Sequence, residues 1–82
     1  MDGIEAFWVE SDDGEVLTRE FPDTGPAYEA AHPLLLAADD ADAIALIGRR
    51  PDGRTVEITR GQSLLDISEI HLGLPARSPV PR

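Results

Sequence analysis

The chain has 82 residues, no cysteine and a formal net charge of −9, and all seven of its basic residues are arginine. So short a chain forms one domain with a thin core. The lack of cysteine excludes disulfides, thiolate catalysis and cysteine-based zinc sites. A small secreted domain usually needs disulfides or a structural metal for stability, so we expect a soluble cytoplasmic protein. The N-terminus has no signal-peptide pattern, and no apolar run is long enough for a membrane span. Arginine without lysine, together with abundant alanine, is typical of a GC-rich bacterial or phage genome.

The charge is distributed unevenly along the chain. Residues 1–42 carry twelve carboxylates and one arginine, whereas residues 43–82 carry four carboxylates and six arginines. Such asymmetry between two halves points to partner binding. A net acidic chain is repelled by nucleic acid and by anionic membranes and is attracted by basic proteins. The alternative is that the negative charge only keeps a small protein soluble and monomeric.

The first expected elements are two strands joined by a tight turn. Ile4–Ser11 and Glu15–Phe21 are rich in aromatic and β-branched residues. Asp13 and Gly14 lie between them, and Asp-Gly favours a hairpin turn because glycine accepts a positive φ. Both faces of the first strand carry apolar side chains, which predicts a central strand.

A helix is predicted over residues 25–39. Asp23 or Thr24 can cap its N-terminus, and Pro26 suits the first turn, where a backbone N–H has no partner within the helix. Pro33 removes one backbone hydrogen bond and clashes with the preceding turn. We therefore expect either a kink at this proline or two helical pieces.

A second pair of strands is predicted after the polar segment 39–42. Residues 43–49 are apolar on both faces, and residues 55–60 alternate between apolar and polar. Residues 50–54 read Arg-Pro-Asp-Gly-Arg, which favours a turn because proline presets φ and glycine adopts the left-handed conformation.

The C-terminal part leaves two alternatives open. Ser63 is followed three residues later by Asp66, which resembles a helix-capping box and predicts a short helix that ends near Leu72. An extended edge segment is the alternative. Residues 73–82 contain three prolines and no apolar periodicity, so we expect a Pro-rich extended tail there, outside a single domain formed by residues 1–72.

Together these elements predict an α+β domain with ββαββ order. We expect a four-stranded antiparallel sheet, in the order 2-1-3-4, packed on one kinked helix, with the short C-terminal helix as an addition. Hairpin–helix–hairpin is a common plan that carries no function by itself.

No pattern in the sequence amounts to an active site. His32 and His71 have no serine or carboxylate at a catalytic spacing. Ser63 lacks the Gly-x-Ser-x-Gly context of a hydrolase nucleophile, and the lysine of a phosphate-binding loop is missing. The aspartates of residues 39–42 do not have the spacing of a calcium loop. We therefore expect no enzymatic activity, no cofactor and no metal.

Two sets of charged residues are the candidate binding residues. The acidic set, on the first hairpin, could meet a basic partner surface through charge complementarity. The basic set, on the second hairpin, could hold a carboxylate or a phosphate, because the guanidinium fork binds both. Alternatively, these arginines pair with the acidic half of the same chain or of a second copy. The acidic set is Glu10, Asp12, Asp13, Glu15 and Glu20, and the basic set is Arg49, Arg50, Arg54 and Arg60.

The function expected from these features is that of a small, acidic, non-catalytic protein-binding module. Inhibitors, antitoxin or immunity proteins and phage anti-defence proteins act in this way, by docking on a basic partner surface. We expect no direct contact with nucleic acid or membrane. The alternative is a small homodimeric structural or accessory subunit, which would pair through an exposed sheet edge.

Overall fold

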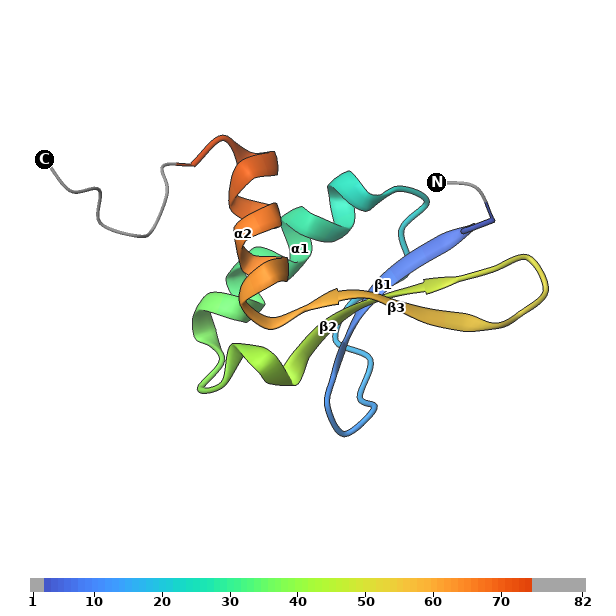
Figure 1. Ribbon diagram of the computed structural model, residues 1–82, viewed down its shortest axis with the longest axis horizontal. Helices are drawn as coiled ribbons and strands as arrows, with labels where there is room; N and C mark the ends of the chain where they lie inside the picture. Colours follow the sequence, from blue (N-terminus) through green and yellow to red (C-terminus); the bar gives the residue numbers. More distant parts are fainter. Residues whose placement is uncertain (1–2, 75–82) are drawn as a thin grey trace, which may run out of the picture.

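The computed structural model describes residues 3–74, which form a three-stranded antiparallel sheet and two α-helices (Figure 1). The α+β class is confirmed, but the prediction of four strands on one helix is wrong. Most of the predicted tail, residues 75–82, lies outside the described residues. In chain order the elements are β1 (Ala6–Ser11), α1 (Thr24–Ala37), the short 3-10 turn η1 (Ala41–Ala43), β2 (Ile44–Arg49), β3 (Thr55–Arg60) and α2 (Gly61–Leu72).

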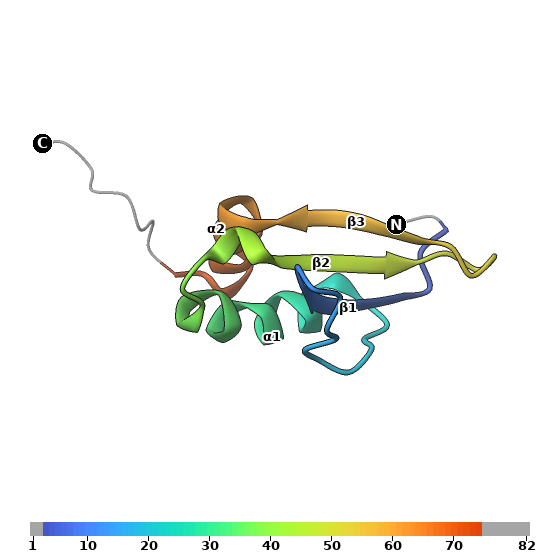
Figure 2. The same ribbon diagram turned by 90° about the horizontal axis from the view of Figure 1, so that it is seen from below.

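The three strands lie side by side in the order β1-β2-β3, and each neighbour is antiparallel (Figure 2). The pairing of Val9 with Leu46 places both side chains on the same face of the sheet. Leu46, Val9 and Leu64 of α2 are fully buried. Both helices contribute to this one core, so they pack on the same face of the sheet.

The predicted second strand, residues 15–21, does not form. This segment returns along the free edge of β1 and makes only two isolated bridges, Val16 to Glu10 and Phe21 to Phe7. Three steps along β1 separate the two bridged positions, but five steps separate them along the returning segment. A continuous ladder needs equal numbers of steps, so two residues must leave it. A side chain fills the gap: the backbone N–H of Val9 donates to Oγ1 of Thr18.

The helix α1 is one uninterrupted segment and not two pieces. It begins after Asp23, whose backbone is extended, and it contains Pro33 in its second half. Pro33 and Glu29, the residue whose carbonyl loses its helical donor, are both exposed. Water can therefore satisfy that carbonyl, which explains how the helix continues past the proline.

Of the two alternatives for the C-terminal part, the structure has the helix. It begins at Gly61, two residues before Ser63, and Arg60 occupies the cap position without a capping side-chain bond, so Ser63 is not the cap. It ends at Gly73, which has a φ of 74°. The N–H of Gly73 donates to Ile70 and that of Leu74 donates to Glu69, the pattern of a glycine-terminated helix.

Candidate functional site

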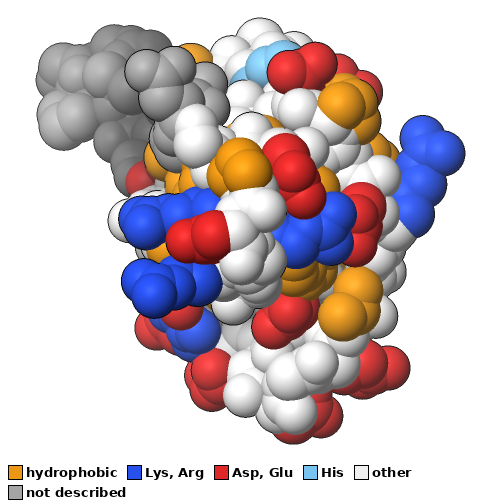
Figure 3. Space-filling model, turned by 90° about the vertical axis from the view of Figure 1, so that its right-hand side faces the viewer, with side chains coloured by type: hydrophobic (Ala, Val, Ile, Leu, Met, Phe, Trp, Pro, Cys, Tyr) orange, Lys and Arg blue, Asp and Glu red, His pale blue; other side chains and the backbone are white. Residues whose placement is uncertain are grey.

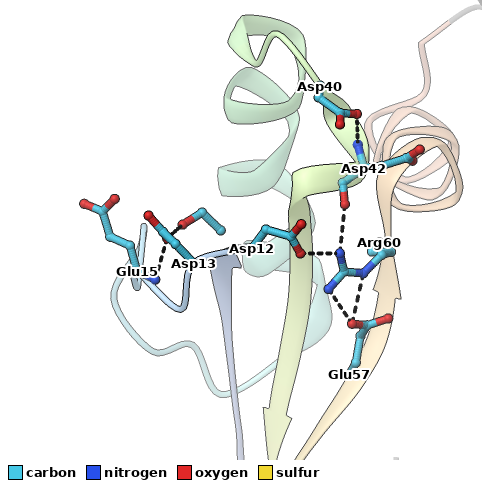
Figure 4. Close-up of polar contacts among 8 residues, drawn as sticks. Asp12, Asp13, Glu15, Asp40, Asp42, Glu57 and Arg60 are labelled. Carbon is cyan, nitrogen blue, oxygen red and sulfur yellow. Dashed lines mark hydrogen bonds and ion pairs between the residues drawn. The ribbon is translucent and has the colours of Figure 1, made fainter.

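One end of the molecule gathers two acidic segments that are distant in the sequence. The turn at residues 12–15 follows β1, and the segment at residues 39–43 precedes β2. The last β1–β2 pair, Ser11 with Ile44, brings them to the same end of the sheet. Figure 4 shows the carboxylate of Asp12 and the backbone carbonyl of Asp42 turned toward the side chain of Arg60, while Asp13, Glu15 and Asp40 lie farther from it. We call this region the acidic end, and its residues are Asp12, Asp13, Glu15, Asp40, Asp42, Glu57 and Arg60.

Arg60 is the cation at the centre of the acidic end. Its Nη1 donates to Oδ1 of Asp12 and to the backbone carbonyl of Asp42, both at 2.8 Å. Its Nε and Nη2 donate to Oε1 of Glu57 at 3.0 and 2.7 Å. The hydrogen bonds with Glu57 and Asp12 raise the pKa of the Arg60 guanidinium above its ordinary value. Arg60 therefore stays charged and is occupied by the protein itself.

A β-bulge explains why Arg60 and Glu57 meet. The register between β2 and β3 shifts so that Leu46 pairs with Thr59 and the next residue, Ile47, pairs with Glu57. Ile58 is the extra residue, and it lets positions 57 and 60 share a face that strict alternation would separate. The hydrogen bond from Arg60 lowers the pKa of the Glu57 carboxyl.

The aspartates of the acidic end also shape the backbone. Asp13 accepts hydrogen bonds from the hydroxyl of Ser11 and, at 3.0 Å, from the backbone N–H of Glu15. The bond from Ser11 is the main cause that lowers the pKa of Asp13. Asp40 accepts from the N–H of Asp42 at 3.0 Å and so caps η1. Asp13 and Asp40 thus accept backbone hydrogen bonds and are exposed to solvent at the same time.

The opposite end of the sheet mixes both signs of charge (Figure 3). Arg49 donates from Nη1 and Nη2 to the two carboxylate oxygens of Glu20 at 2.8 and 3.0 Å, and from Nε to Glu5 at 3.1 Å. The bond with Glu20, and then that with Glu5, raises the pKa of Arg49. Its guanidinium also lies over the ring of Trp8, 5.7 Å from the ring centroid. No one-signed surface forms at this end.

The structure therefore divides both predicted sets. Asp12, Asp13 and Glu15 lie together at the acidic end, but Glu20 lies with Arg49, and Glu10 accepts a 2.7 Å bond from Nε1 of Trp8. Of the basic set, Arg60 joins the acidic end, Arg49 joins Glu20 and Glu5, and only Arg50 and Arg54 extend from the β2–β3 turn into solvent. Arg54 lies 3.7 Å from Asp52. The four arginines therefore have different surroundings in the fold.

Sequence analysis missed two histidine–carboxylate pairs between the helices. Nε2 of His32 lies 3.3 Å from Oε2 of Glu69, and Nε2 of His71 lies 3.1 Å from Oε2 of Glu29. Each pair joins α1 to α2 across about forty residues of sequence, so no local spacing could reveal it. His71 also lies close to Gly25, where a Cβ would approach its Cε1 to 3.1 Å. Both pairs are side-chain contacts between α1 and α2.

Neither a metal-binding cluster nor a membrane-spanning helix is found among residues 3–74. Within residues 3–74 no three side chains of the histidine, aspartate or glutamate type are grouped so that they could hold a metal ion. In the same part of the chain no helix has the length and apolar character that crossing a membrane requires. Comparisons of the chain with protein-family models, with curated proteins and with solved structures find no match. The acidic end is thus a candidate on the strength of its own geometry.

Proposed function

We propose that this chain is a small non-catalytic protein-binding module that docks its acidic end on a basic surface of a partner protein. The observation that supports this most directly is the convergence of the 12–15 turn and the 39–43 segment on one end of the sheet (Figure 4). Asp13, Glu15 and Asp40 are exposed there, and Arg60 is the one cation among the residues that Figure 4 draws.

Charge of one sign on a compact surface acts in two ways. It accelerates the encounter with an oppositely charged partner, and it rejects partners of like charge. A protein that binds nucleic acid through a basic groove is one kind of partner that this surface suits. The proposal includes action in the cytoplasm of a bacterial or phage-infected cell, as the composition suggests.

The test compares two variants of equal net charge. The first, Asp13→Asn/Glu15→Gln/Asp40→Asn, removes three of the six carboxylates of the acidic end, and Asn at positions 13 and 40 retains the oxygen that accepts the turn and cap bonds. The control, Asp23→Asn/Asp52→Asn/Asp66→Asn, removes the same charge from other elements. Each protein is used to capture partners from extract of its native cells at 50 mM and 500 mM salt.

We expect the wild type and the control to retain a partner that the first variant loses, and we expect high salt to release that partner because it screens exposed charges. Equal loss in both variants would mean that only net charge matters. A partner that withstands high salt, or none at all, would contradict the proposal.

A second candidate function is a homodimeric subunit, and one observation favours it. The β1 edge of the sheet is occupied by residues 15–21, but β3 has no partner strand on its outer side within residues 3–74. An open edge can recruit a strand of a second copy. Light scattering decides, because a monomer at millimolar concentration would eliminate this function.

A further inference from the structure

Arg60 lies where both strand ladders end. The β1–β2 ladder ends at the pair Ser11–Ile44, and the β2–β3 ladder ends at the pair Ala45–Arg60. Beyond these pairs the chain leaves the sheet in two acidic segments. Arg60 bonds both of them at once, through Asp12 on one side and the carbonyl of Asp42 on the other.

From this placement we infer that Arg60 is the positioning residue of the acidic end: it holds the 12–15 turn and η1 in one fixed arrangement, so that their carboxylates form a single surface. The part of this inference that concerns docking rests on the function proposed above. The part that concerns the coupling of the two segments stands on the hydrogen bonds of Arg60 alone.

The geometry requires arginine and not merely a positive charge. All three of its side-chain nitrogens donate: Nε and Nη2 converge on one oxygen of Glu57, and Nη1 reaches both acidic segments. The planar guanidinium presents these donors in a fixed fork, whereas the ammonium of lysine is a point charge on a flexible stem. Lysine at position 60 can replace the charge but not the full set of contacts.

The backbone around Arg60 holds it in place. The bulge at Ile58 directs Arg60 to the same face as Glu57. The next residue, Gly61, has a φ of 63° and lies so close to Asp42 that a Cβ would overlap its carboxylate. A side chain at position 61 would require the Asp42 side chain to move, and the positive φ itself favours glycine, so Gly61 permits the close approach of the 39–43 segment to β3.

A positioning role for Arg60 predicts weaker docking for a variant that charge attraction alone predicts to dock more tightly. Arg60→Gln makes the protein one unit more negative, which should strengthen attraction to a basic surface. If Arg60 positions the carboxylates, the same change loosens their arrangement and weakens docking. Arg54→Gln is the matched control, because it adds the same unit of negative charge and the exposed Arg54 guanidinium approaches a carboxylate of Asp52 only to 3.7 Å.

Amide hydrogen exchange tests the coupling without a partner. The reporters are amides with hydrogen bonds on each side: Gly14 and Glu15 in the turn, and Asp42 and Ala43 at η1. We expect Arg60→Gln to accelerate exchange about tenfold or more on both sides, Arg60→Lys to do so by less, and Arg54→Gln to leave both unchanged. Salt at 500 mM should move the wild type toward the Arg60→Gln result.

Two outcomes would overturn the inference: unchanged exchange in Arg60→Gln, or acceleration on one side only. If Arg60→Gln does not fold, Arg60→Lys and the salt series of the wild type decide. With a captured partner in hand, Arg60→Gln should bind more weakly than Arg54→Gln, and equal or tighter binding would show that position 60 does not shape the docking surface. Failure to find any partner would count against the proposed function and leave the exchange result intact.

Discussion

The two faces of the sheet are buried by different means. The inner face lies under α1 and α2, and its Val9 and Leu46 are 0% exposed. The opposite face, which we call the open face, has no helix over it in the described part of the chain (Figure 1). Even so, Trp8 and Ala45 on the open face are 7% and 2% exposed.

Long charged side chains explain how the open face is buried. Arg49 covers the ring of Trp8 and is itself held by Glu20 and Glu5, while Glu10 accepts the bond from the indole. An arginine stem can cover apolar surface while its guanidinium stays in contact with water. On the open face, Arg49 therefore takes the place that a helix takes on the inner face: it covers an apolar side chain of the sheet.

The largest expected effect is a difference in unfolding free energy between truncations of a side chain on the inner face and of one on the open face. Leu46→Ala removes a fully buried side chain and should lower the free energy of unfolding by about 3 kcal/mol. Ile47→Ala, on the partly exposed open face, should cost about 1 kcal/mol, because water already reaches that site. Urea unfolding measures both, and equal losses would mean that the two faces are buried alike.

The next effect tests the cover over Trp8. Trp8 is the one tryptophan of the chain, so its fluorescence reports this site directly. Arg49→Gln should shift the emission maximum to longer wavelength by roughly 5–10 nm, because water replaces the guanidinium over the ring. Arg54→Gln provides the control, and its spectrum should match that of the wild type. An unchanged spectrum in Arg49→Gln would assign the cover to other side chains.

The smallest expected effect depends on pH. Because Arg60 lowers the pKa of Glu57, this carboxyl is more acidic in the folded chain than in the unfolded one. Its stabilising contribution is therefore full above the ordinary glutamate pKa and is lost as the pH falls through the lowered value. The difference in unfolding free energy between wild type and Arg60→Gln should shrink from pH 6 to pH 2. A constant difference would show that the pair does not couple to folding.

Local patterns in the sequence predicted β1, β2, β3 and a helix over residues 25–39, which the structure forms as α1, because each has a period or a turn signal of its own. The error came from Glu15–Phe21, whose composition favours a strand as strongly as that of β1. Whether this segment forms a strand depends on its register with β1. The bridges at Val16 and Phe21 have different registers, so one continuous ladder cannot contain both. Register is a tertiary property, and propensity does not encode it.

The sequence predicted the two segments of the acidic end but not their convergence, which again depends on how the strands pair. The sequence showed Asp12, Asp13 and Glu15 in a turn and a second run of aspartates at residues 39–42, but it contained no signal that joined them. The joining residue, Arg60, was assigned to a basic set with Arg49, because both lie on the second hairpin. The bulge at Ile58, which turns Arg60 toward the acids, arises from pairing with β2 and leaves no mark in local composition.

The bonding of β1 to residues 15–21 has a consequence for growth of the sheet. The N–H groups of Phe7, Val9 and Ser11 all donate to this segment, to Phe21, Thr18 and Glu15 respectively. A sheet that can add a strand at one edge alone pairs edge to edge with a single second copy, and the joined sheet then has no free edge left for a third. Growth into fibres requires two sheet edges that can each pair with another strand. Strand pairing through β3 would therefore stop at two chains.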